Sequence, residues 1–390
     1  MTEGFTPSEV EQVVGQRYSA GAHEVQPALC CPVDYDSALL GAIPAEVLER
    51  DYGCGDPSRY LVAGEKVLDL GCGGGKICFI ASQVVGPTGR VIGVDFNDDM
   101  LALARGAAPA VAQRVGYGNV EFRKGRIQDL GLDLDALGGW LAAHPVTDVE
   151  SLTGLEAEQQ WLRTEQPLVP DDSVDVVVSN CVLNLVAPEH KQRLFSEVFR
   201  VLRRGGRAVI SDIVSAVEVP EHLRADPELW SGCVAGAFQE EAFLAAFERA
   251  DFYGIHVVKR DSAAWQVVEG IEFRAVTVVA YKGKQGECRD HGQAVIYPGP
   301  FKAVLDDDEH LFLRGLPTAV CAKSFAIYAR EPYAGHFQLL QPVEPVDPAT
   351  APPLDCAPLT TLTALGSAPT ARRDVSGLTT SGCQPASGCC

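Results

Sequence analysis

The chain has 390 residues, which is long enough for one large domain and a smaller one. Its apolar share of 46% and charged share of 22% are typical of a globular enzyme. The formal net charge of −20 argues against nucleic acid as a partner, because phosphate binding depends on Lys and Arg. We see no secretory signal and no apolar run of about 20 residues, and therefore expect a cytoplasmic protein that does not bind a membrane.

Apolar patterning predicts a helical N-terminal segment followed by an α/β domain. Residues 1–64 are expected to form a helical lid segment that contains Cys30, Cys31 and Cys54, with a first helix over residues 6–20. Over residues 65–253, buried strands alternate with helices, and the strands are expected at 66–70, 90–95, 119–124, 175–179 and 207–212. This alternation predicts a Rossmann-like, doubly wound parallel sheet that helices cover on both faces.

Three further parts of the chain depart from this alternation. The stretch 130–170 is too long for a plain connection and has Leu and Trp at helical spacing, so we expect an inserted helical pair. Residues 254–341 contain short strand candidates and predict a small C-terminal α+β or antiparallel β module. Those candidates are 271–281, 293–297, 302–305, 318–322 and 324–328. Residues 342–390 are rich in Pro, Ala, Thr and Ser, which favours a disordered tail, and this tail ends in Cys389-Cys390.

A glycine-rich loop follows the first predicted strand and favours a nucleotide-like cofactor. The run Asp69-Leu-Gly-Cys-Gly-Gly-Gly75 lies where that strand turns into a helix, and glycine there lets the backbone approach a ligand closely. A dinucleotide fingerprint would need glycine at position 76, where the chain has Lys76. Asp95 ends the second strand, where a carboxylate can accept hydrogen bonds from both ribose hydroxyls.

The loop resembles the first motif of class I S-adenosylmethionine-dependent methyltransferases. The resemblance implies that the loop contacts the amino-acid end of the cofactor, that residues 125–128 cover the adenine edge, and that Asn180 lies near the methyl group. The cofactor contacts implied in this way are Tyr52, Asp69, Gly71, Cys72, Gly73, Asp95, Phe96, Met100, Ile127, Gln128 and Asn180.

Thirteen cysteines are unexpected in a reducing compartment, and their number is odd. No Cys-x-x-Cys pair occurs, which excludes the usual zinc ribbon and the thioredoxin motif. Any metal or metalloid site must therefore be assembled from distant parts of the chain. A cysteine without a functional role is usually a small, buried, apolar residue. We prefer this interpretation for Cys72, Cys78, Cys288, Cys321 and Cys356.

Three cysteine-containing segments resemble the arsenite methyltransferase family: Tyr-Gly-Cys-Gly at 52–55, Asn-Cys-Val-Leu-Asn-Leu at 180–185, and Leu-Trp-Ser-Gly-Cys at 229–233. The resemblance covers residues 30–330 and implies that Cys54, Cys181 and Cys233 bind trivalent arsenic. It also implies that Cys30 or Cys31 is a redox partner of Cys54, and that the C-terminal module at 254–341 belongs to the arsenic site.

The expected reaction is transfer of methyl groups from S-adenosylmethionine to arsenite or methylarsenite that is bound as a thiol conjugate. The family resemblance implies a thiol reductant, thioredoxin or glutathione. Two alternatives remain open. The acceptor could be a small organic molecule, as in quinone or sterol C-methylation, or the chain could bind metalloids without catalysis.

Overall fold

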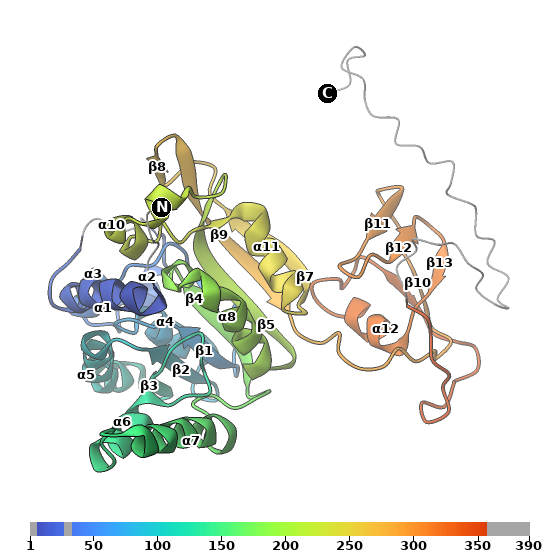
Figure 1. Cartoon of the computed structure of the whole chain (residues 1–390). Helices are drawn as coiled ribbons and strands as arrows, with labels where there is room; N and C mark the ends of the chain where they lie inside the picture. Colours follow the sequence, from blue (N-terminus) through green and yellow to red (C-terminus); the bar gives the residue numbers. More distant parts are fainter. Residues whose placement is uncertain (1–5, 27–32, 357–390) are drawn as a thin grey trace. The chain divides into compact units, whose positions relative to one another are not determined.

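A computed structural model of the protein describes residues 6–26 and 33–356 (Figure 1). The chain forms two units, Met1–Lys284 and Gln285–Cys390. The first unit contains every element of the predicted α/β domain, and the second contains most of the predicted C-terminal module.

The first unit is built around one large sheet. Its main path runs in the order β3 (Val120–Lys124), β2 (Arg90–Asp95), β1 (Lys66–Leu70), β4 (Val174–Asn180), β5 (Leu202–Ser215), β9 (Ile271–Tyr281) and β7 (Tyr253–Arg260). Short strands β6 (Phe238–Gln239) and β8 (Gln266–Val268) pair with β5 and β9. The strands from β3 to β5 are parallel, as predicted, whereas β9 is antiparallel to both β5 and β7.

Helices cover both faces of this sheet because neighbouring strand residues point to opposite sides. Leu68 and Val177 face the side covered by α8 (Pro188–Val201) and α11 (Glu240–Arg249). Val67 and Val176 face the side covered by α4 (Lys76–Val85) and α5 (Asp98–Val115). Two apolar layers result, and the central strands are buried on both faces, as is typical of parallel sheets. The predicted Rossmann-like fold class is confirmed.

The boundary of the C-terminal module differs from the one expected at residue 254. Both β7 and β9 belong to the large sheet, and the second unit begins after Lys284. The reason is that β9 is a long apolar strand, buried from Phe273 to Ala280, which pairs with β5 over nine residues. From sequence, this strand cannot be distinguished from a strand of a separate module, because its partner β5 lies about sixty residues earlier in the chain.

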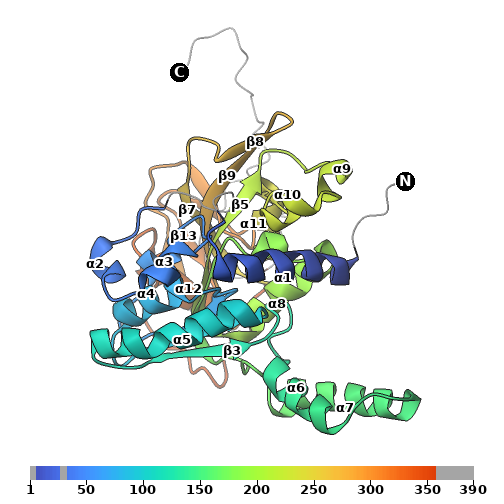
Figure 2. The same ribbon diagram turned by 90° about the vertical axis from the view of Figure 1, so that its left-hand side faces the viewer.

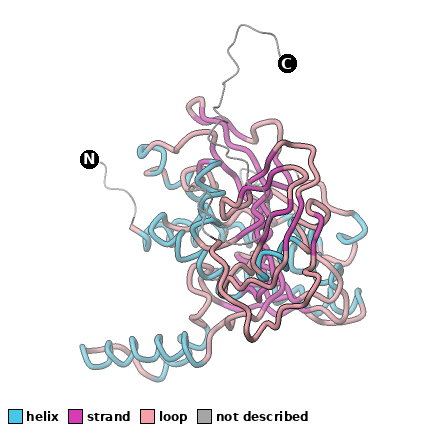
Figure 3. Tube along the Cα trace, turned by 90° about the vertical axis from the view of Figure 1, so that its right-hand side faces the viewer, coloured by secondary structure: helices cyan, strands magenta, loops and turns pink. Residues whose placement is uncertain are grey.

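The inserted helical pair is present and forms a hairpin of α6 (Leu134–Ala143) and α7 (Val149–Glu165). Asp133 and Asp148 cap the two helices by accepting backbone N–H groups. Figures 2 and 3 show the pair extending away from the sheet of the first unit. Only Leu132, Leu137 and Leu162 form a small buried cluster there, so this hairpin has little core of its own.

The N-terminal segment is helical, with α1 (Pro7–His23), α2 (Ser37–Leu40) and α3 (Ala45–Glu49). Thr6 and Glu9 form a capping box that begins α1, which packs against α5 and α10 (Pro227–Ser231). A short helix α9 (Glu221–Arg224) precedes α10. Among the described residues, none of the helices has both the length and the apolar character that a membrane-spanning helix needs.

The described part of the second unit contains two small antiparallel sheets. Strand β10 (Ala294–Ile296) lies between β13 (Pro317–Ala319) and β14 (Gln338–Leu340), and β11 (Ala303–Leu305) pairs with β12 (Leu311–Leu313). The strand expected at 324–328 is wrong, because α12 (Ala322–Tyr328) occupies it. Short apolar runs do not distinguish helix from strand. Here the side chain of Cys321 caps the helix by accepting the N–H of Ser324.

The expected disordered tail also differs in its first part. Residues 342–356 are described, and Ala351 is buried. Backbone hydrogen bonds join this stretch to the start of the unit, from Asp290 to Pro352 and from Leu354 to Cys288. Residues 357–390, including Cys389-Cys390, lie outside the described residues.

Candidate active site

The glycine-rich loop between β1 and α4 has the backbone conformation that its composition predicts. Gly71, Gly73 and Gly75 have φ values of 65°, 50° and 89°, in the left-handed region that favours glycine. A Cβ atom on Gly71 would lie 2.3 Å from a methyl group of Val182, so this backbone also passes very close to the neighbouring loop. Any larger residue there would displace one wall of the adjoining cavity.

Asp95 lies at the end of β2 and faces this loop. Its carboxylate accepts the backbone N–H groups of Gly73 and Asn97, both at 2.9 Å. Burial raises the pKa of Asp95, and the amide hydrogen bonds oppose that rise in part. The N–H of Phe96 also bonds to this carboxylate. A carboxylate has about four acceptor positions, so Asp95 can still accept a hydrogen bond from a hydroxyl group of a ligand.

A cavity of about 1060 Å³, counting space open to solvent, lies above the carboxyl ends of the parallel strands. Its lining includes all eleven residues expected to contact the cofactor, namely Tyr52, Asp69, Gly71, Cys72, Gly73, Asp95, Phe96, Met100, Ile127, Gln128 and Asn180. Ligands of open α/β sheets bind at this edge. The cavity is largely apolar and carries a few convergent polar groups, so the residues present fit an adenosine-containing cofactor.

Helix α1 covers the cavity. The sequence pattern did not indicate which residues of this helix would contact it. Its residues Glu11, Val14 and Tyr18 line the cavity. Glu11 accepts hydrogen bonds from Arg126 and Gln128, both at 3.0 Å, and thereby ties the helix to the loop after β3. These contacts hold α1 over the cavity, and its action as a lid stays a prediction.

Asn180 ends β4 and holds the segment that carries Cys54. Its Oδ1 atom accepts the N–H groups of Cys54 (3.0 Å) and Gly55 (2.9 Å). Its Nδ2 atom donates to the carbonyl of Gly55 (2.8 Å) and to the hydroxyl of Tyr35 (3.3 Å). These four bonds use all the donor and acceptor positions of the amide. Asn180 therefore forms part of the cavity wall while its polar atoms bind the protein itself.

The two glycines beside Cys54 allow this close approach. A Cβ atom on Gly53 would lie 2.0 Å from Nδ2 of Asn180, and one on Gly55 would lie 2.6 Å from Cβ of Ser211. Non-bonded carbon and nitrogen atoms do not approach so closely. The glycines of the Tyr-Gly-Cys-Gly segment are thus explained by contact with the ends of β4 and β5.

The structure brings the three predicted arsenic ligands together. Cys54, Cys181 and Cys233 are almost fully buried and belong to one apolar cluster, to which Phe273 and Ala275 of β9 also contribute. Cys54 and Cys181 form a disulfide. The thiol of Cys233 donates to the carbonyl of Cys181 at 3.2 Å. All three cysteines belong to the first unit, and of the stretch 254–341 that was expected to form part of the arsenic site, Phe273 and Ala275 lie in the same apolar cluster.

Two of these cysteines have unusual backbone conformations. Cys181 and Cys233 have φ values of 64° and 63°, which residues other than glycine rarely adopt. Such strained residues concentrate at functional sites. Cys30 and Cys31 lie outside the described residues, so their expected pairing with Cys54 stays a prediction.

Asp212 of β5 is a site residue that the sequence reasoning missed. One of its carboxylate oxygens lies within 4.8 Å of the sulfurs of Cys54 and Cys181. It accepts hydrogen bonds from the N–H of Leu183 (2.9 Å) and the side chain of Asn184 (2.8 Å). Burial raises its pKa to about 6. The available signal was a carboxylate within the run 208–214, which is mostly apolar, because charged residues are rarely buried without a partner.

Two family models match the chain. A methyltransferase domain matches residues 61–137 and 147–251, with a gap that covers the second half of α6 and the turn before α7. A family described as a domain of unknown function matches residues 284–365 and nearly coincides with the second unit. The cofactor fold and the C-terminal module are thus matched separately.

Individual relatives match over most of the chain. The arsenite methyltransferase of Aquipseudomonas alcaligenes is 31% identical over 333 residues, which cover 81% of this chain and 86% of that protein. The arsenite methyltransferase of Halobacterium salinarum is 34% identical over 281 residues, or 66% of this chain and 61% of that protein. The crystal structure of an arsenic (III) S-adenosylmethionine methyltransferase from Chlamydomonas reinhardtii matches with a TM-score of 0.54. Its identity is 26%, and the match covers 83% of this chain and 99% of that one. Because the similarity extends over most of the chain, the protein belongs to the arsenite methyltransferase family and has the class I S-adenosylmethionine-dependent methyltransferase fold.

Proposed function

We propose that this enzyme transfers methyl groups from S-adenosylmethionine to trivalent arsenic bound by Cys54, Cys181 and Cys233. The observation that carries the proposal is the position of Cys181. It lines the same cavity as the eleven expected cofactor residues, while Cys54 is joined to it and Cys233 contacts its carbonyl. Methyl donor and thiol-bound acceptor would therefore meet in one cavity.

Thiolates suit this substrate because trivalent arsenic is soft, and thiolate is the soft ligand of proteins. Three thiols replace the three hydroxyl groups of arsenous acid, and three water molecules leave. Arsenic then retains one lone pair, which serves as the nucleophile. Rate enhancement would come mainly from holding two reactants in line, an effect worth up to about 7–11 kcal/mol in favourable cases.

The protein's own groups would position both reactants. Gly71, Gly73 and Asp95 would bind the cofactor, and α1 would exclude water from above. When bound, S-adenosylmethionine supplies an electrophilic methyl group on a sulfonium sulfur. Asn180 would act as a positioning residue, since it holds the Cys54 segment at the end of β4.

The disulfide between Cys54 and Cys181 represents the oxidised state of this site, in which two of the three proposed ligands cannot bind arsenic. Two electrons and two protons from a thiol reductant restore both thiols, and the reductant becomes a disulfide. We therefore propose thioredoxin or glutathione as reductant, and a reducing compartment such as the cytoplasm.

The test is arsenite-dependent release of S-adenosylhomocysteine in the presence of thioredoxin or glutathione. Cys54→Ser, Cys181→Ser and Cys233→Ser should each abolish the first methylation, because each removes one of three ligands. Cys78→Ser, at a buried cysteine of α4 that does not line the cavity, should keep the reaction and serves as the matched control. Full activity of Cys181→Ser would refute the assignment.

The same assay separates the two alternatives. A C-methyltransferase of the quinone or sterol type would need an organic acceptor and would tolerate blocked thiols. A non-catalytic metalloid-binding protein would bind arsenite through these cysteines and release no S-adenosylhomocysteine.

A further inference from the structure

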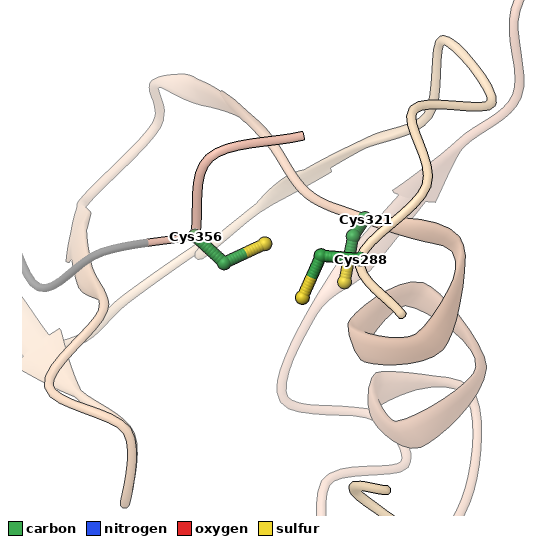
Figure 4. Close-up of side chains that lie close together, drawn as sticks. All are labelled: Cys288, Cys321 and Cys356. Atoms are coloured by element: carbon green, nitrogen blue, oxygen red, sulfur yellow. The ribbon is translucent and has the colours of Figure 1, made fainter. Parts of the chain in front are cut away.

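The second unit contains a cluster of three cysteines that the sequence pattern gave no reason to connect. Cys288, Cys321 and Cys356 lie far apart in the chain, yet their sulfur atoms all lie within 4.8 Å of one another. Figure 4 shows the thiol of Cys356 directed toward those of Cys288 and Cys321. The expectation that these three cysteines act as separate, buried apolar residues is not what the structure shows, since Cys288 and Cys356 are half-buried.

Backbone hydrogen bonds hold the three segments in this arrangement. The N–H of Leu354 donates to the carbonyl of Cys288 at 2.8 Å, and the N–H of Ala322 donates to the carbonyl of Arg289 at 2.9 Å. The first bond joins the Cys356 segment to the Cys288 segment, and the second joins the Cys288 segment to the Cys321 segment. The three thiols are therefore positioned by the fold of the unit and not by chance proximity of loose side chains.

Side-chain contacts leave the sulfurs available to a ligand. Sγ of Cys321 accepts the N–H of Ser324 at 3.4 Å and contacts its hydroxyl at 3.3 Å. The imidazole of His310 bonds to the carbonyl of Cys356 at 3.0 Å and to Asp306 at 2.8 Å, so both ring nitrogens are engaged away from the thiols. A cavity of about 810 Å³, counting space open to solvent, is lined by Cys288 and Cys356 and gives access to the cluster.

The number and type of ligands in this cluster indicate which ion it can bind. Structural zinc sites are almost always tetrahedral, with four nitrogen or sulfur ligands. Among the described residues, the cluster contains three sulfurs and no fourth histidine, cysteine or carboxylate ligand. Trivalent arsenic is soft and takes three thiolates in a pyramid, which matches this set. A disulfide between two of these cysteines would leave the third thiol without a partner, so disulfide formation does not account for all three.

We propose that Cys288, Cys321 and Cys356 form a second binding site for trivalent arsenic, separate from the site of methyl transfer. Three S–H groups and three As–OH groups become three As–S bonds and three water molecules, and no electrons are transferred. The choice of arsenic rests on the proposed function, whereas the existence of a three-thiol site rests on the second unit alone. This assigns a ligand to a module that matches a family of unknown function.

The experiment uses the full-length chain with arsenite as the probe. In a reference variant, Cys54, Cys181 and Cys233 are changed to serine, as are the five cysteines outside the described residues. Five thiols remain, Cys72, Cys78, Cys288, Cys321 and Cys356. After reduction, arsenite loading and desalting, we expect one equivalent of arsenic per chain and X-ray absorption fitted by three sulfur neighbours.

Adding Cys288→Ser, Cys321→Ser or Cys356→Ser to the reference variant should remove this equivalent, while adding Cys72→Ser, in the first unit, should keep it. In the wild-type background, each of the three substitutions should lower the arsenic content by one equivalent, which tests the proposal even if the reference variant does not fold. Methylation in the wild-type background is measured separately, so failure of the proposed function and failure of this site are distinguishable.

Three results would overturn the proposal. The arsenic content could be insensitive to all three substitutions. The purified protein could carry zinc that depends on these cysteines and that arsenite does not displace. Mass spectrometry could find two of the three cysteines joined as a disulfide that persists under reducing conditions and excludes arsenite.

Discussion

Replacing Asn180 with alanine tests how the site is held together. The side chain makes three hydrogen bonds to the backbone of Cys54 and Gly55, of 3.0, 2.9 and 2.8 Å, in a buried environment. Each bond contributes about 1 kcal/mol net, so the substitution should destabilise the docked position of the Cys54 segment by about 3 kcal/mol. This corresponds to a loss of about 100-fold in a docking-dependent rate.

We therefore expect Asn180→Ala to lower kcat/KM for arsenite by about 100-fold. Affinity for S-adenosylmethionine should change much less, because the amide has no free hydrogen-bonding position to offer the cofactor. Asn180→Asp keeps the acceptor for both N–H groups and loses the donors, so its defect should be smaller. Initial rates of S-adenosylhomocysteine release against arsenite concentration, together with calorimetric titration of the cofactor, separate the two effects.

Asn119→Ala is the matched control. This asparagine also bonds to backbone carbonyls, of Gly86 and Gly89, but does not line the cavity. It should lower the free energy of unfolding and leave KM for arsenite unchanged. If Asn180→Ala instead keeps its arsenite kinetics and loses cofactor affinity, then the positioning role inferred from the structure is wrong.

Three further predictions concern the same site. Gly53→Ala should lower arsenite methylation strongly, because its Cβ would lie 2.0 Å from Nδ2 of Asn180; wild-type kinetics would contradict the close approach. Glu11→Gln should raise the dissociation constant of S-adenosylmethionine only about two- to fivefold in calorimetric titration, since its ion pair with Arg126 is partly exposed. Burial raises the pKa of Asp212 from 3.8 to about 6, so its ionisation opposes folding. The resulting loss of folding free energy is absent below pH 3.8, where the carboxyl group is protonated in both states, and complete above about pH 6. Asp212→Asn should therefore gain stability relative to wild type as pH rises from 4 to 6. Urea unfolding followed by tryptophan fluorescence measures this, because all four tryptophans lie in the first unit, and a difference that does not change with pH would refute it.

The sequence by itself determined the features that depend on short stretches of chain. The glycine loop after β1 and Asp95 at the end of β2 each follow an apolar strand, and a parallel sheet places such strand ends at one edge. The expected cofactor residues at or just after the ends of β1 to β4 line one cavity for this reason, whereas Tyr52, from the segment before β1, and Met100, from α5, reach it through tertiary packing. The inserted pair α6–α7 was readable because helical spacing is a local pattern.

Only the tertiary structure decided which distant groups meet. It joined Cys54 to Cys181, brought Asp212 beside them, and gathered Cys288, Cys321 and Cys356 into one cluster. It also assigned β9 to the large sheet, where pairing between β5 and β7 buries its apolar residues. Such contacts depend on how separate segments pack, and a cysteine in the sequence has the same local signature whether it binds a ligand or fills a core.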